Sequence, residues 1–227
     1  MTIEIKKLFK SRTILYLLII MLLLSISFSL FVIHGLDSEL SIGDKEKIAA
    51  EIYFQLIYYC TPLLLVFLAD FVFNQDFVMG TIKHLILKSD RNTIYIIKLL
   101  SLSLASIVLT ALFHASSLLS ITWGLGISAA DSLLTAVLYE SIPVLEMSLL
   151  FSLVSLLGKK NNLLYLISLH LIILFLAESS LSPGKYSYVS SFKAAILDSR
   201  IPVSSIIGIL LLTLATYLLF THKELTE

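Results

Sequence analysis

Four Glu and His side chains lie well inside long apolar stretches of this sequence, where a charge is costly if the stretch crosses a membrane. They are His114, Glu140, Glu146 and His170. Residues of these types can hold a metal ion and support catalysis, can line a polar substrate pathway, or can join packed helices. The sequence has neither a His-Glu-x-x-His pattern on one helical face nor a paired Glu-Glu, which disfavours a catalytic metal site. We therefore expect no catalytic and no metal-binding residue, and the pathway and packing interpretations stay open.

The composition places these residues in a membrane protein. Hydrophobic residues make up 58% of the 227 residues and charged residues only 14%, whereas soluble domains carry about 25% charged residues. A bilayer core about 30 Å thick is crossed by a helix of about 20 residues. Six stretches are apolar over about that length, and they cover residues 13–34, 52–73, 93–123, 132–157, 162–178 and 203–221. Because lipid offers the backbone no hydrogen bonds, we predict an all-α polytopic fold of six transmembrane helices, with residues 1–227 as one domain.

Basic residues are distributed unevenly over the gaps between the predicted spans. Eleven of the sixteen Lys and Arg residues fall on the side of the N-terminus, and five fall on the other side. Since short cytoplasmic loops carry the excess of Lys and Arg, both termini are predicted to be cytoplasmic. Residues 2–12 are amphipathic and predict an N-terminal helix that lies in the membrane interface. The basic residues flank the spans, so we expect the lipid bilayer as their partner and no nucleic acid.

The gap between the second and third spans predicts a short amphipathic helix. Gly80 permits a sharp break in the chain, Thr81 can cap the helix that follows, and Ser89 can cap the next span. One face of this helix is apolar and the other is polar. The apolar stripe consists of Ile82, Leu85 and Ile86, while Lys83, His84 and Lys88 face elsewhere. We predict a two-turn helix parallel to the membrane on the cytoplasmic side, whose apolar stripe requires a surface to dock against.

The residues around this helix resemble those of a known family. The pattern is an acid-x-x-x-Gly-Thr run, a short apolar helix, Ser-x-Arg, and a lysine seven residues on. Its residues are Asp76, Gly80, Thr81, Ser89, Arg91 and Lys98. Together with the six-span topology, the pattern resembles the ABC transporter permeases of the type-2 exporter class. The resemblance implies that residues 81–88 are the coupling helix, which sits in a cleft of a separate ATPase subunit. The residues it implies for ATPase coupling are Asp76, Gly80, Thr81, Ile82, Lys83, Leu85, Ile86 and Arg91.

A permease of this class leaves ATP hydrolysis to another chain. This sequence has no Gly-x-x-x-x-Gly-Lys-Ser/Thr loop, so we expect no enzymatic activity and no cofactor here, with ATP and Mg bound by the partner ATPase. The resemblance implies a pair of permeases, identical or different, with two ATPase subunits in a bacterial plasma membrane. By analogy with small permeases, the exported substrate is expected to be an antimicrobial peptide, a drug or another amphipathic molecule. The alternatives are an intramembrane enzyme that uses the four Glu and His residues, and an ATP-independent secondary transporter.

The predicted orientation can be tested by thiol labelling in a Cys60→Ala background, because Cys60 is the single cysteine of the chain. Cysteines introduced at Ser41 and Ser182 should react with an impermeant thiol reagent added from outside the cell. Cysteines at Ser89 and Asn161 should react only after the membrane is permeabilised. Labelling of the Ser89 variant in intact cells would show that the orientation is reversed.

Overall fold

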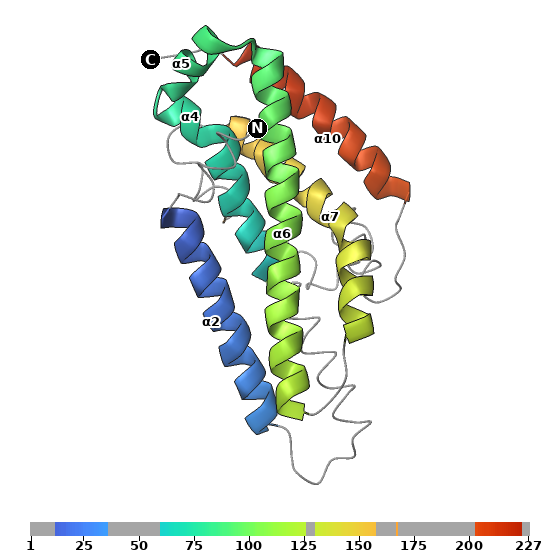
Figure 1. The fold of residues 1–227 in the computed structure, drawn as a ribbon. Helices are drawn as coiled ribbons and strands as arrows, with labels where there is room; N and C mark the ends of the chain where they lie inside the picture. The colour runs from blue at the N-terminus through green and yellow to red at the C-terminus, as the bar shows by residue number, and fades with distance from the viewer. Residues whose placement is uncertain (1–11, 36–59, 126–129, 158–166, 168–202, 224–227) are drawn as a thin grey trace.

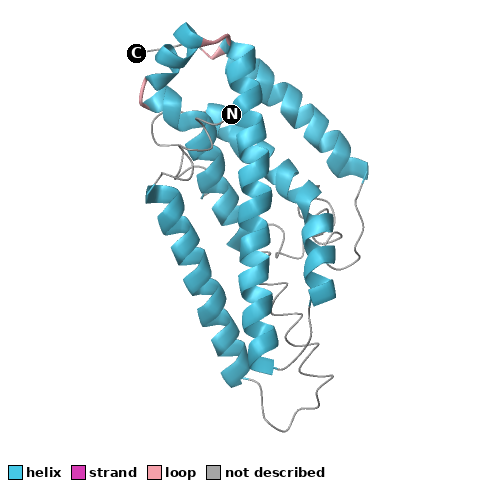
Figure 2. Cartoon of the chain, viewed as in Figure 1, coloured by secondary structure: helices cyan, strands magenta, loops and turns pink. Residues whose placement is uncertain are grey.

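The computed structural model describes residues 12–35, 60–125, 130–157, 167 and 203–223, and these form helices with no strand among them (Figures 1 and 2). The all-α prediction is therefore confirmed for this part of the chain. One helix covers Cys60–Val78 and contains the π-turn η1 (Asp70–Asn74), followed by α4 (Gln75–Val78). The other helices are α2 (Arg12–Gly35), α5 (Thr81–Lys88), α6 (Arg91–Leu125), α7 (Ala130–Leu157) and α10 (Val203–His222).

Four helices are long and apolar enough to cross a membrane, so the chain is a membrane-embedded protein. The four apolar segments are Cys60–Val78, Arg91–Ser116, Tyr139–Leu157 and Ser205–His222, which correspond to the second, third, fourth and sixth predicted spans. The helix α2 covers the first predicted span, 13–34, and its role as a span stays a prediction. Apart from residue 167, the fifth predicted span, 162–178, lies outside the described residues, as does most of the predicted interfacial helix 2–12.

The second span continues beyond its predicted end at residue 73, because its polar residues form hydrogen bonds inside the bundle. Asn74 Nδ2 donates to Asp70 Oδ1 at 3.1 Å, and Ser155 Oγ of α7 donates to the same oxygen at 2.8 Å. Because the Asp70 carboxylate and the Asn74 amide have hydrogen-bond partners inside the bundle, both can be buried within a continuing helix. The helix passes through the π-turn and ends only at Val78, so Asp76 belongs to the helix rather than to a loop.

The longest helix, α6, is the element along which the others pack. Its 35 residues measure about 52 Å at 1.5 Å per residue. α2 and α7 both pack along it, and α10 packs against α7 and reaches the start of α6 (Figure 1). The start of α6, α5 and the C-terminal ends of α7 and α10 meet at one end of the bundle, here called the α5 end.

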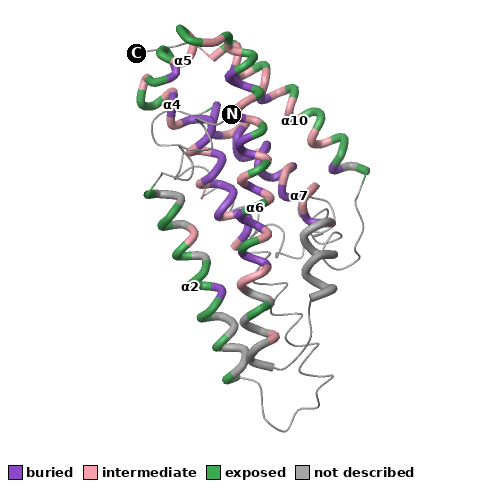
Figure 3. Tube along the Cα trace, in the orientation of Figure 1, coloured by how far each residue is buried: buried purple, intermediate pink, exposed green. Residues whose placement is uncertain are grey.

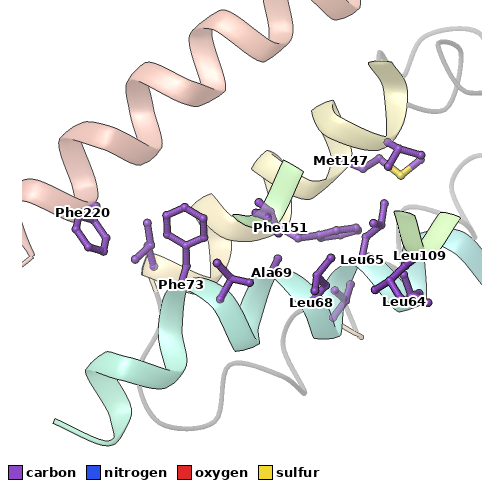
Figure 4. Close-up of a cluster of buried hydrophobic side chains, with 14 of the residues drawn as sticks. Leu64, Leu65, Leu68, Ala69, Phe73, Leu109, Met147, Phe151 and Phe220 are labelled. Atoms are coloured by element: carbon purple, nitrogen blue, oxygen red, sulfur yellow. The ribbon is translucent and has the colours of Figure 1, made fainter. Parts of the chain in front are cut away.

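The apolar core lies between the Cys60–Val78 helix, α6 and α7, with α10 closing it near the α5 end. Leu65, Leu68 and Phe73 meet Phe151 of α7 and Phe220 of α10 (Figure 4). Buried positions follow these helices, while α2 and α10 turn many apolar side chains outward (Figure 3). Outward leucines and isoleucines of this kind suit a surface that faces lipid.

Asp90 caps the start of α6, in place of the predicted Ser89. Thr93 N donates to Asp90 Oδ2 at 3.0 Å, and Thr93 Oγ1 donates to Asp90 Oδ1 at 2.6 Å. Ser89 has an extended backbone and ends α5 instead. Ser and Asp are both good N-caps, so composition alone did not distinguish two adjacent candidates.

These hydrogen bonds lower the pKa of Asp90, chiefly through the Thr93 hydroxyl and then through the Thr93 N–H. A carboxylate with a lowered pKa in the folded state stabilises the protein at neutral pH, and this contribution disappears as the pH falls below about 4. We expect Asp90→Ala to lower the thermal unfolding temperature at pH 7, measured on detergent-purified protein, and to have a smaller effect in acid.

Asp90→Asn is the matched control, because asparagine caps helices but carries no titratable group. This variant should keep most of the wild-type unfolding temperature at pH 7. It should also remove the part of the fall in unfolding temperature with acid that comes from residue 90. Equal effects of the alanine substitution at both pH values would show that the Asp90 carboxylate contributes nothing as a charge.

Candidate functional site

The turn between α4 and α5 is built on the predicted glycine. Gly80 has a φ of 69°, in the left-handed region that other residues rarely adopt, and this places α5 at an angle to the preceding helix. Thr81 is the first residue of α5, and its hydroxyl donates to Asp76 Oδ1 at 2.8 Å instead of capping the helix as predicted. Asp76, Gly80 and Thr81 therefore act together to fix where α5 begins.

A buried ion pair joins this turn to α6. Lys98 Nζ contacts Asp76 Oδ2, and it also donates to the carbonyl oxygen of Val72 at 2.5 Å. Val72 lies in the π-turn, so a single lysine contacts both the irregular turn and the residue that holds α5. The Lys98 side chain is 0% exposed and that of Asp76 is 4% exposed. Charges this deeply buried depend on each other, since removal of either would take from the other this counter-ion in a place that solvent does not reach.

Lys98 belonged to the sequence pattern but was not among the predicted coupling residues. A signal for its role was present in the sequence, because it is the only Lys, Arg, Asp or Glu between Arg91 and Asp131. A lone cation in an apolar span needs a partner, and Asp76 is the partner it finds. The sequence did not show that these two residues, 22 positions apart, lie side by side.

The apolar stripe of α5 covers the chain's own core rather than a free docking surface. Ile82 is 2% exposed, and Leu85 and Ile86 pack partly buried against the core cluster. The prediction that these three residues share one face is confirmed, but that face is already covered within the chain. The periodicity of a helix shows which residues lie together and does not show what packs on them.

The surface that α5 does expose is different and mixes basic with apolar side chains. Leu87 is 83% exposed; the exposed Val78 ends α4, and the exposed Met79 lies in the turn just before α5. The basic residues around them are Lys83, His84 and Lys88, all exposed. We name these six residues the α5 surface.

Arg91 and Lys223 join helix ends to one another beside α5. Arg91 Nη1 donates to the carbonyl oxygens of Thr221 and of Lys223, the second at 3.3 Å, at the C-terminal end of α10. Lys223 Nζ donates to Leu156 O at 2.8 Å at the end of α7 and lies 4.9 Å from the centre of the Phe77 ring. Burial lowers the pKa of Lys223, and the nearby Asp70 carboxylate partly opposes this. Both cations therefore sit where helix carbonyls lack partners and the helix dipole is negative.

Two of the predicted pathway residues lie together, and a third lies apart from them. His114 of α6 forms a buried pair with Glu140 of α7, whereas the buried Glu146 lies against Gly208 of α10, close to where a Cβ would be. His170 lies outside the described residues. Glu140 and Glu146 thus face different helices, and each fills a helix contact in this structure. A small residue at position 208 is what leaves room for the second carboxylate.

Within the described residues, no group of three or more His, Cys, Asp and Glu side chains is arranged to hold a metal ion. Comparison of the chain with models of known protein families, with curated proteins and with solved structures gives no match. The candidate site is therefore the α5 end of the bundle, where Asp76, Gly80, Thr81 and Lys98 set the position of α5.

Removal of one partner of the buried pair should destabilise the protein strongly. Lys98→Met leaves the Asp76 carboxylate buried without its cation, and we expect a loss of about 3–5 kcal/mol in unfolding free energy. In the Asp76→Asn/Lys98→Met double variant, the amide oxygen can still accept from Thr81 and no charge is buried. The double variant should therefore be more stable than Lys98→Met, as measured by thermal unfolding in detergent.

Thr81→Val serves as a control that removes only the hydroxyl donor, with an expected loss of about 1 kcal/mol. If the double variant were as unstable as Lys98→Met, the Asp76–Lys98 ion pair would not be what attaches the turn between α4 and α5 to α6.

Proposed function

We propose that the chain is the transmembrane permease subunit of an ATP-driven exporter, with α5 as the element that contacts a separate ATPase. The supporting observation is the attachment of α5: a two-turn helix fixed to a long membrane helix through the buried Asp76–Lys98 pair. A passive linker between two spans would not need a buried ion pair. The resemblance of this segment to the coupling helix of type-2 exporters supports the same conclusion.

The α5 surface has the chemistry of a protein contact. Apolar side chains at its centre can bury area against a partner, and the basic residues can pair with acidic groups around that area. An ATPase surface with an apolar pocket bordered by Asp and Glu would fit both features. Leu87 is the most exposed of the apolar residues and is proposed as the central contact.

Movement of α5 would reach the membrane helices through α6. The stripe of Ile82, Leu85 and Ile86 packs α5 on the bundle, and Asp76 ties its first turn to Lys98. Because α6 also packs along α2 and α7, a displacement at α5 would be felt by most of the described bundle. ATP and Mg would act in the partner, and this chain would convert the resulting motion into transport.

The wider setting follows from the same proposal. The permease would pair with a second permease, identical or different, in a bacterial plasma membrane, with both termini cytoplasmic. The outward apolar faces of α2 and α10 suit contact with lipid or with that second permease. An antimicrobial peptide, a drug or another amphipathic molecule is the proposed substrate class.

The proposal predicts that a charge at Leu87 breaks the complex without unfolding the chain. Leu87→Asp should weaken association with the ATPase at least tenfold, about 1.4 kcal/mol, because an unpaired carboxylate would enter an apolar contact. The measurement is pull-down of the ATPase from native membranes by the tagged chain, followed by titration of the purified pair.

His222→Asp is the matched control, since it adds the same charge to an exposed position at the end of α10. It should leave association unchanged, and Leu85→Asp should instead lower the stability of the chain itself. If no ATP-hydrolysing protein is recovered with the wild-type chain, the proposal fails. Transport by the chain alone in proteoliposomes would favour the ATP-independent alternative.

A further inference from the structure

A line of buried polar side chains runs along the seam between α6 and α7. Ser106 and Ser148 lie 2.9 Å apart between their hydroxyl oxygens, and His114 Nε2 contacts Glu140 Oε2. His114 follows Ser106 by eight residues on α6, and Glu140 precedes Ser148 by eight residues on α7. The two antiparallel helices therefore stay aligned with each other over about 12 Å. Between the two contacts lies Thr110, which is also buried and whose hydroxyl has no hydrogen-bond partner among the described residues.

Glu140 is the unusual member of this seam. It is 0% exposed, and while Oε2 contacts His114, Oε1 has no hydrogen-bond partner in the part of the chain that the structure describes. With a neutral His114, an ionised Glu140 would leave one negative charge buried with a bare oxygen, which is costly. Addition of one proton makes the pair neutral and leaves only a carbonyl-like oxygen without a partner.

The described cations lie too far away to balance that charge. Lys98 precedes His114 by sixteen residues on α6, and Lys223 contacts Leu156, sixteen residues beyond Glu140 on α7. Each separation corresponds to about 24 Å of helix.

The remaining titratable groups on the packed elements are acidic, neutral or at a distance. On α7, Tyr139 adjoins Glu140 and Glu146 turns toward α10. Cys60 begins the neighbouring helix, which runs antiparallel to α6. The remaining groups are on α6 Arg91 and Tyr95, on α2 Arg12, Tyr16 and His34, on α10 Tyr217 and His222, and on the Cys60–Val78 helix Asp70 and Asp76. Tyr95 precedes His114 by nineteen residues, and Asp70 contacts Ser155, fifteen residues beyond Glu140.

The pair lies in the half of α6 and the half of α7 that are farther from α5. His114 lies eleven residues before the end of α6 at Leu125, and Glu140 lies ten residues after the start of α7 at Ala130. Each separation corresponds to about 15 Å of helix. The other ends of the two helices, at Arg91 and Leu157, are twenty-three and seventeen residues away. The nearer helix ends are therefore those opposite α5, which makes water on that side the nearest source of a proton.

We propose that the His114–Glu140 pair is a binding site for one proton, taken up from the side of the membrane opposite α5. The proton adds to the Glu140 carboxylate, the hydrogen bond to His114 holds it, and no other bond forms or breaks. The protonated pair keeps α6 and α7 in register, and loss of the proton leaves a charge that favours their separation. The site goes beyond the proposed function and does not depend on it, because one chain supplies both residues.

Infrared difference spectroscopy of the full purified chain in lipid nanodiscs tests the site. The probe is the proton alone: spectra recorded between acidic and alkaline pH should show one carbonyl stretch of a protonated carboxylic acid, which disappears as the pH rises. Glu140→Gln should remove this band. The stability of wild type relative to the glutamine variant should fall by about tenfold in the folding equilibrium per pH unit between the ordinary glutamate pKa of about 4.3 and the midpoint of the band. Above the midpoint the difference should stay constant, because neither state of the wild type then holds the proton.

Glu140→Asp covers the case in which the glutamine variant does not fold, because it keeps an acid and should shift the band and its midpoint rather than remove them. Glu146→Gln is the control on the same helix and should leave the band in place. The proposal is overturned if wild type shows no titrating carboxylic acid, or if the band is unchanged in both Glu140 variants. Neither result bears on ATPase binding, which the Leu87 experiment measures separately.

Discussion

A charge buried in an apolar bundle must have its partner within reach, and at the α5 end this requirement fixes the structure around Lys98. The lysine has no exposed atoms, and Asp76 and the Val72 carbonyl both face it. Asp76 can do so only because the helix continues past its apolar part and passes through a π-turn. The same carboxylate then accepts from Thr81, which sets the first turn of α5. One electrostatic constraint thus connects the second span, the Gly80 turn and α6.

Polar contacts also specify the rest of the bundle, for a reason that is general in membranes. Lipid is as apolar as leucine, so burial of apolar side chains does little to choose one helix arrangement over another. Hydrogen bonds and close approaches choose instead: Ser106 with Ser148, Tyr95 with the Thr213 carbonyl at 2.8 Å, and Glu146 against Gly208. Each of these contacts fixes the relative position of one helix pair.

The sequence predicted the parts of this structure that depend on local pattern. Apolar runs located the membrane helices, Gly80 marked the break, and the spacing of Ile82, Leu85 and Ile86 identified one face of α5. What it could not predict depends on which segments meet in space. The stripe of α5 covers the bundle itself, Asp90 rather than Ser89 caps α6, and a π-turn extends the second helix. The Asp76–Lys98 pair and the separation of Glu140 from Glu146 likewise follow from tertiary packing.

The π-turn at Asp70–Asn74 limits which insertions and deletions this gene segment can accept. Each residue of an α-helix adds about 100° of rotation. Gain or loss of one residue between the turn and Asp76 would rotate Asp76 by about that angle, so that it would point away from Lys98 while Thr81 and Gly80 moved with it. Surface loops tolerate changes of length, but the segment from Asp70 to Gly80 has a fixed length, because a carboxylate at its far end must reach one ammonium group.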